Sequence, residues 1–263
     1  MNTIKKLFND INKYGEFIRF KTRCELKSDI IDTKLGWIWW ILEPLCFMFI
    51  YMFVFMFLFK SKEESYALFI FVGVSIWDFF SGCLKKSVNL IKNNSSIIKN
   101  TYIPKTVLVI QTMAYMSFRL LICMSISALL MVYYKIEFSF KVIYVLIILL
   151  VLFFLTYSIS CFLMHFGVYL SDLSNITNIV LRMIFYITGI FYSIPNRFPA
   201  PYNKWLIKFN PIALLINEAR NILIYNKIEN YHELFLWLII SIIFSVFSSL
   251  IIYKNENSYL KVN

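Results

Sequence analysis

Six long runs of apolar residues divide this chain, and shorter polar stretches separate them. The first run extends from about Trp37 to Phe59 and contains one acid, Glu43, and one proline, Pro44. A helix of about 20 residues crosses a hydrocarbon core of ~30 Å. The pattern therefore predicts an all-α integral membrane protein with six transmembrane helices, at about residues 37–59, 67–84, 106–134, 142–164, 176–194 and 235–253.

The first 34 residues follow a different pattern. Apolar residues recur at helical spacing between Ile4 and Ile18, and lysines and arginines lie between them. We therefore predict an amphipathic cytoplasmic interface helix over residues 1–34, ahead of a transmembrane domain over residues 35–263. This helix is either a general membrane anchor or a docking surface for a cytoplasmic partner. The candidate contacts on it are Arg19 and Arg23.

Composition and charge support the membrane assignment and give an orientation. The chain is 60% apolar, with a mean hydropathy of +0.69, which is more than a soluble domain can bury. The net charge of +11 does not indicate nucleic-acid binding, because the basic residues flank the apolar runs. Their density in residues 1–34 and 85–105 predicts that both termini are cytoplasmic. The even number of spans then places the basic stretch 195–234 outside.

Residues 85–105 form a second candidate interface. No acid occurs between Asp78 and Glu137, whereas lysines recur there with apolar residues among them. The segment is either a solvated loop attracted to anionic lipid or a short cytoplasmic helix that seats in a groove of a partner. In the second case, apolar side chains would fix the position and lysines would steer the encounter. The candidate contacts are Lys92, Ile97, Ile98 and Lys99.

Four polar residues fall at similar depths in four different predicted spans. Counted at about 1.5 Å per residue from each cytoplasmic end, they all lie about 8–9 Å deep. A charge at a helix centre costs about 2.5–3.5 kcal/mol on insertion scales, so it usually has a function. We expect either an inner polar layer in which Arg182 pairs with an acid, or independent snorkelling of each side chain. The candidates are Glu43, Asp78, Gln111 and Arg182.

The stretch 195–234 is too apolar for a free loop. Pro211 suits the first turn of a helix, and Asn210 suits its N-cap. Two short re-entrant helices would fit the stretch, and they would line or close a pathway as an outer gate. The nearby aromatic residues form either an interfacial belt or a ring-lined route on which sugars stack. The candidates are Tyr186, Phe191, Tyr192, Trp205, Asn210, Pro211 and Arg220.

Motifs of catalysis are missing from the sequence. None of the six glycines is followed by lysine, so the chain has no phosphate-binding P-loop. The histidines, His165 and His232, lie on opposite predicted sides, and the five cysteines form no CxxC pair. We therefore expect no catalytic residue, no metal and no cofactor on this chain. If ATP drives the protein, another chain binds it.

Several motifs, each loose alone, follow one another along nearly the whole chain. The pattern LG-x-x-W-x-x-x-x-P is formed by Leu35, Gly36, Trp39 and Pro44. The pattern K-x-x-(Y/F)-x-P-(R/K) is matched by Lys99, Tyr102, Pro104 and Lys105. Their order and spacing resemble the permease subunits of type-2 ABC exporters, in the polysaccharide branch of O-antigen, wall teichoic acid and capsule export. An Arg-Asp pair of that family is matched by Asp172 alone, because Ser171 stands at the arginine position.

This resemblance implies a channel-forming subunit of the bacterial cytoplasmic membrane rather than an enzyme. A homodimer of this chain would carry two copies of an ATP-binding subunit, which would hold ATP and Mg. The N-terminal helix, residues 85–105 and Asp172 would contact that subunit. An undecaprenyl-linked polysaccharide would pass outward through the membrane. A permease for drugs or small lipids, a membrane glycosyltransferase and a secondary transporter stay open as alternatives.

Overall fold

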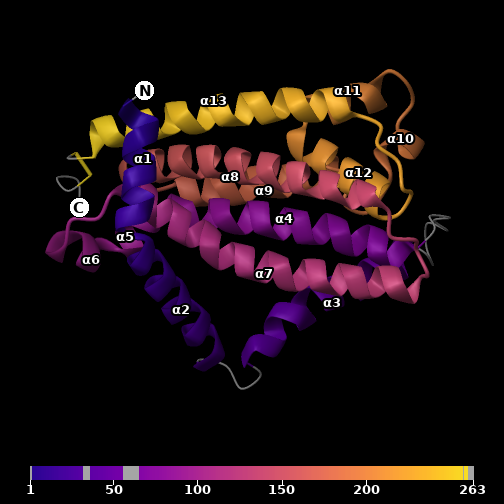
Figure 1. Ribbon diagram of the computed structural model, residues 1–263, viewed down its shortest axis with the longest axis horizontal. Coiled ribbons are helices and arrows are strands. Elements are labelled where there is room, and N and C mark those ends of the chain that lie inside the picture. The colour runs from indigo at the N-terminus through magenta and orange to yellow at the C-terminus, as the bar shows by residue number, and fades with distance from the viewer. Residues whose placement is uncertain (1, 32–35, 56–64, 257, 260–263) are drawn as a thin grey trace.

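The computed structural model describes residues 2–31, 36–55, 65–256 and 258–259, and within them the chain is helical and without strands. The long helices lie side by side along the longest axis of the molecule (Figure 1). Helix α1 (Asn2–Lys13) and the last turns of α13 (Tyr231–Asn255) lie at one end of this bundle. Helices α10 (Ile194–Arg197) and α11 (Tyr202–Phe209) lie at the other. We refer to these as the α1 end and the α11 end.

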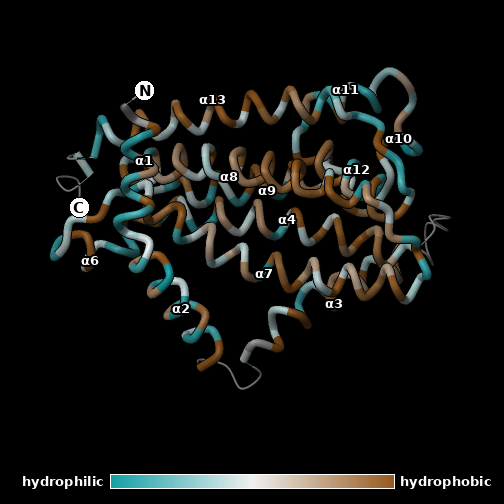
Figure 2. The backbone as a smooth tube through the Cα atoms, in the orientation of Figure 1, coloured by the Kyte–Doolittle hydropathy of each residue, from teal (hydrophilic) through white to brown (hydrophobic). Residues whose placement is uncertain are grey.

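Among the described residues, four helices are long and apolar enough to cross a membrane: α4 (Tyr66–Val88), α7 (Lys105–Tyr133), α8 (Ile143–Tyr169) with the 3-10 turn η3 (Phe140–Val142) before it, and α13. Figure 2 shows apolar residues along their lengths and polar residues at both ends of the bundle. The prediction of an all-α membrane protein is therefore confirmed.

Two shorter apolar helices, α3 (Trp39–Phe53) and α9 (Leu173–Ile187), stand where the first and fifth spans were predicted. Each has 15 residues and is thus about 22 Å long, which is less than a hydrocarbon core of ~30 Å. The predicted end of the first span, residues 56–59, lies outside the described residues. The count of six crossings stays a prediction.

Helix α9 ends seven residues before the predicted end of the fifth span. Gly189 adopts a positive φ of 72°, a conformation that terminates helices and that glycine adopts at little cost. The chain then turns through residues 188–193 into the short helix α10. The turn places Phe191 against the bundle rather than in a span.

Helix α4 is the centre of the bundle, with α3, α7, α8, α9 and α12 (Pro211–Leu223) packed around it. Nearly all of its side chains are buried. Gly167 of α8 lies directly against the carbonyl oxygen of Val88, where a Cβ atom would overlap it. Small residues allow such close backbone approach between membrane helices.

The predicted N-terminal helix consists of two helices, because it breaks at Tyr14. Helix α1 separates polar from apolar residues sharply and packs across the end of α13, whereas α2 (Gly15–Ile31) is only weakly amphipathic. Helix α2 runs obliquely along α7 (Figure 1). Near its end, Asp29 accepts hydrogen bonds from the Tyr115 hydroxyl and, at 3.3 Å, from Trp40 Nε1. Tyr115 is ten residues into α7, about 15 Å along it. Thus α2 is not confined to the α1 end, because its last turn contacts α7 about 15 Å from that end.

Candidate functional site

A cavity of about 720 Å³ lies between α3, α4 and α9. We call it the groove. Three of the four residues predicted for an inner polar layer line it, from three different helices. The lining consists of Glu43, Phe47, Tyr51, Val74, Trp77, Asp78, Ser81, Lys85, Asn178, Leu181, Arg182, Phe185 and Tyr186.

The groove changes character along its length. Toward the α1 end, Lys85 and Ser81 of α4 face the cavity together with Asn178 and Arg182 of α9. Toward the α11 end, the lining consists mainly of aromatic rings. At this end the ring centroid of Phe191 lies 3.8 Å from that of Tyr51. The groove therefore offers hydrogen-bonding and cationic groups at one end and flat apolar faces at the other.

One ion pair stands at the side of the groove. Arg119 Nη2 of α7 lies 2.9 Å from Glu43 Oε2 of α3. Asp78 lies within range of the charges of both residues. Arg182, which we expected to pair with Glu43 or Asp78, has no side-chain hydrogen bond or ion pair within the described residues. Arg119 was not among the four candidates, because depth along a span does not reveal that α3 crosses α7 obliquely.

Gln111 does not belong to this layer. Its side chain is fully buried on α7 and is absent from the groove lining. Within the described part of the chain, neither of its amide atoms has a hydrogen-bond partner. Gln111 was predicted at the same depth as the other three candidates, but its side chain points to a different face of the bundle.

The α11 end is fixed by Arg220 of α12. Its side chain is 4% exposed and donates to three carbonyl oxygens: Phe69 (2.9 Å), Gly189 (2.8 Å) and Ile190 (2.6 Å). The guanidinium also lies 3.5 Å from the centroid of the Phe69 ring. Arg220 therefore ties α12, α4 and the turn after α9 together.

The predicted start of α12 is confirmed. Asn210 Oδ1 accepts from the backbone N–H groups of Ile212 (3.1 Å) and Ala213 (3.2 Å), and Pro211 occupies the first turn. Asn210 Nδ2 also donates to Thr188 Oγ1 at 3.2 Å, and the Tyr192 hydroxyl donates to the Tyr186 carbonyl at 2.8 Å. The α12 cap is thereby joined to the turn that closes the groove.

Glu218 is a structural residue that the sequence reasoning missed. It is 1% exposed and accepts from Asn230 Nδ2 (2.8 Å), Asn221 Nδ2 (3.2 Å) and the Glu229 backbone N–H (3.3 Å). One feature of the sequence could have identified Glu218: it is the acid in a largely apolar helix, α12. These bonds hold the connection between α12 and α13.

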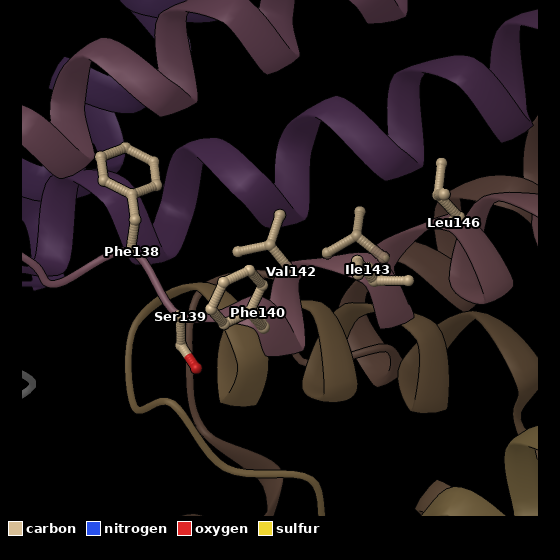
Figure 3. Close-up of a pocket in the computed structure, with 7 residues that line it drawn as sticks. Phe138, Ser139, Phe140, Val142, Ile143 and Leu146 are labelled. Carbon is tan, nitrogen blue, oxygen red and sulfur yellow. The ribbon is translucent and has the colours of Figure 1, made fainter.

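Two further hollows are lined almost entirely by apolar side chains. One, of about 470 Å³, contains Trp205 with Tyr202 and Phe209 of α11, so Trp205 lies apart from the groove. The other, of about 530 Å³, lies where the turn after α7 enters α8, and Figure 3 shows the side chains around it. Neither offers the charged groups of the groove. Within the described residues, no group of three His, Cys, Asp or Glu side chains could hold a metal ion.

The predicted partner contacts gather at the α1 end or on α2, which starts there. Lys21 of α2 donates to Asn94 Oδ1, between α5 (Leu90–Asn93) and α6 (Ser95–Asn100), and burial lowers the pKa of Lys21 although the charge of Glu25 opposes this. Ile98 is 6% exposed and packs into the chain, so it is not available to a partner as we expected. The other candidates are exposed: Arg19, Arg23, Lys92, Ile97, Lys99 and Asp172.

Long apolar helices around a charged and aromatic groove define a multi-pass membrane protein. A family model described as ABC-2 type transporter matches residues 18–224. The chain belongs to this family. Two similar proteins of Klebsiella pneumoniae are both named O-antigen export system permease protein RfbA. One is 24% identical over 245 residues, or 92% of each chain, and the other is 23% identical over 229 residues, or 86% of each.

Proposed function

We propose that this chain is the permease subunit of an ATP-driven exporter that moves a lipid-linked cell-envelope polysaccharide outward from the cytoplasm. The family membership and the names of the two relatives support transport of this kind. The observation that carries the proposal is the groove, because its lining changes from cationic to aromatic along the bundle. A glycan joined to a lipid through phosphate needs both kinds of surface.

In this proposal the two ends of the groove have separate tasks. Arg182 and Lys85 bind the phosphate groups of the lipid carrier, since guanidinium and ammonium groups are the usual phosphate ligands. Trp77, Tyr51 and Tyr186 supply aromatic faces on which sugar rings stack. The ion pair between Glu43 and Arg119 keeps α3 next to α7 and so fixes one wall of the groove.

A single chain provides half of the proposed channel. The apolar side chains of Ile179 and Met183 on α9 and of Phe49 on α3 are exposed beside the groove. Contiguous exposed apolar surface next to a functional cavity indicates a partner or lipid. A second copy that meets this face would close the two grooves into one passage, in which Arg220 and the α12 cap hold the outer gate.

The energy source in this proposal is a separate ATP-binding subunit in two copies, which carries ATP and Mg. It would dock at the α1 end, where the exposed basic residues of α2 and of α5–α6 lie near one another because Lys21 bonds to Asn94. Both termini of the permease would then be cytoplasmic. The apolar Ile97 would seat in the partner, and Lys92 and Lys99 would steer its approach.

The test is co-expression of the permease with the products of its neighbouring genes, followed by purification and an assay of ATP hydrolysis in nanodiscs. A stable complex with a P-loop ATPase, weakened by the charge reversals Lys92→Glu and Lys99→Glu, supports the proposal. Glu16→Lys serves as a control. Glu16 is also exposed, on α2, but its substitution by lysine adds positive charge, whereas Lys92→Glu and Lys99→Glu remove it. A permease that purifies without any ATPase contradicts it.

Substrate class is tested separately, by ATP-dependent transfer into inverted vesicles. The export proposal predicts that lipid-linked glycan is taken up and that Arg182→Gln reduces this uptake. Uptake of short-chain fluorescent lipids or of drugs with no uptake of glycan would favour the alternative permease function.

A further inference from the structure

The last turn of α13 and the residues after it form hydrogen bonds to several segments at the α1 end. We call Tyr253, Glu256 and Tyr259 the C-terminal clasp. Glu256 and Tyr259 are buried, and Tyr253 is half-buried. Each hydrogen-bonds to a residue that is distant in sequence. None of the three residues belongs to a motif that the sequence analysis identified.

Glu256 caps a helix that belongs to another part of the chain. Its Oε1 accepts from the backbone N–H of Lys105, the first residue of α7, at 3.3 Å. The N-cap residue of α7 is Pro104, whose side chain cannot accept a hydrogen bond. The first N–H groups of a helix need an acceptor and favour a negative charge. Glu256, which is 7% exposed, supplies both from α13.

The second carboxylate oxygen of Glu256 holds the linker that leads to α7. Oε2 accepts from the Tyr102 hydroxyl at 3.1 Å. Burial, followed by the charge and hydrogen bond of Glu256, raises the pKa of Tyr102 to about 12. Lys105, which is 1% exposed, donates from Nζ to the Ile103 carbonyl at 3.1 Å and attracts Glu256. The linker 101–104 is thus bonded at both its middle and its end.

The clasp also joins the N-terminal helices to this linker. The Tyr253 hydroxyl donates to Asp10 Oδ2 of α1 at 2.7 Å and accepts from Thr106 Oγ1 at 3.2 Å. The Tyr14 hydroxyl, at the break between α1 and α2, donates to the Tyr102 carbonyl at 3.3 Å. On the opposite side, Tyr259 bonds to His165 Nδ1 of α8 at 2.7 Å.

We propose that Glu256 is a positioning residue that sets the orientation of α5–α6 for docking of the ATP-binding subunit. This inference rests on the proposed function. The linker has only four residues, and Pro104 fixes one of its φ angles, so a displacement at Glu256 moves α6 directly. Through Tyr253 and Tyr14, the same clasp places α1 and α2, which carry the other basic contacts. The clasp therefore keeps the two docking segments in one arrangement.

The first experiment uses the permease alone in nanodiscs, so that it does not depend on any partner. Hydrogen exchange at residues 101–107 is compared for the native chain, Glu256→Ala, Glu256→Gln and the control Glu137→Gln, whose residue is exposed in the turn after α7. We expect about tenfold faster exchange for Glu256→Ala, since hydrogen bonds to a charged group are lost. Glu256→Gln keeps one of the two acceptor oxygens and loses the charge, so its exchange rate should fall between those of the native chain and Glu256→Ala. Native exchange rates in Glu256→Ala would overturn the inference.

The second experiment titrates the ATP-binding subunit onto the same variants. At a temperature well below the melting temperature of each variant, we expect Glu256→Ala to weaken binding about tenfold. Glu137→Gln, at an exposed residue of the α11 end, should leave the affinity unchanged. Tyr102→Phe removes one hydroxyl and should weaken binding less, and its effect should not add to that of Glu256→Gln because both act on one bond.

The outcomes separate the two proposals. If the native permease binds no ATP-binding subunit, the proposed function fails, whereas the exchange data still report on the clasp. If the native complex forms and Glu256→Ala binds as tightly as the native chain, the positioning role is wrong. Should Glu256→Ala fail to insert, Glu256→Gln and Tyr102→Phe carry the same comparison with smaller changes.

Discussion

Arg220 and Arg182 lie in helices of similar length, but they differ in burial and in hydrogen bonding. Arg220 is buried at the α11 end and donates to three carbonyl oxygens of α4 and the turn after α9. Arg182 is exposed in the groove and has no side-chain partner within the described residues. The buried Glu218 likewise has several hydrogen-bond donors, whereas Asp78 lines the groove and is half-buried.

The difference indicates which charges maintain the fold and which remain available. A buried guanidinium whose donors all meet acceptors contributes to one defined arrangement of helices, because any other arrangement leaves polar groups unpaired. A charge that is left exposed in a groove between membrane helices contributes little to stability and is retained for another purpose. Stability and transport should therefore respond to different residues.

The largest loss of stability is expected from Arg220→Ala. The change removes the Arg220 hydrogen bonds to three carbonyl oxygens and opens a cavity against Gly73, whose added Cβ would lie 2.5 Å from Arg220 Nη2. We expect a cost of about 3 kcal/mol or more. Arg220→Lys should recover little of it, since one ammonium cannot reach all three acceptors. Thermal unfolding in detergent measures both. A native melting temperature for Arg220→Lys would show that the three bonds are dispensable.

Gly167→Ala should destabilise the fold by a smaller amount. Its new methyl group would overlap the Val88 carbonyl oxygen, so α8 must move away from α4. Overpacking of this kind costs about 1–3 kcal/mol. Gly15→Ala is the matched control, because nothing lies within 4 Å of the position its Cβ would occupy. Equal melting temperatures for the two variants would show that α8 adapts freely.

These two sites show what the sequence could and could not predict. Apolar runs predicted the helices, because every membrane-spanning helix needs apolar side chains whatever it packs against. Lipid tails are as apolar as leucine, so hydropathy could not reveal that α4 is buried and α3 is largely exposed. The cap at Asn210 was predictable because it is local, whereas Arg220 bonds to Phe69 and Glu256 bonds to Lys105, each 151 residues away in sequence.

The candidate site was predicted in part for the same reason. Depth along each span predicted a common layer for Glu43, Asp78 and Arg182, and these three residues line one groove. Depth does not specify the direction in which a side chain points, so Gln111 was placed there wrongly and the pair of Glu43 with Arg119 was missed. Helix crossing angles, which decide these directions, depend on packing along the whole bundle.

The ion pair between Glu43 and Arg119 should have an intermediate effect. Arg119→Glu places two acids side by side near Asp78, and we expect a loss of about 1–2 kcal/mol, close to the upper range for polar contacts between membrane helices. The double variant Arg119→Glu with Glu43→Arg restores opposite charges and should regain most of the loss in a thermal unfolding assay. If the double variant is no more stable than Arg119→Glu, the pair does not hold α3 to α7.

The smallest effect on stability is expected from Arg182→Gln, and this variant decides the comparison. Because Arg182 has no partner within the described part of the chain, its loss should change the free energy of unfolding by less than about 0.5 kcal/mol. Transport of a phosphate-linked glycan should nevertheless fall about tenfold, since a charge-assisted bond to the substrate is lost. Arg182→Lys keeps the charge and should retain most of the transport. A variant that transports normally but unfolds early would reverse the assignment and make Arg182, like Arg220, a residue of the fold.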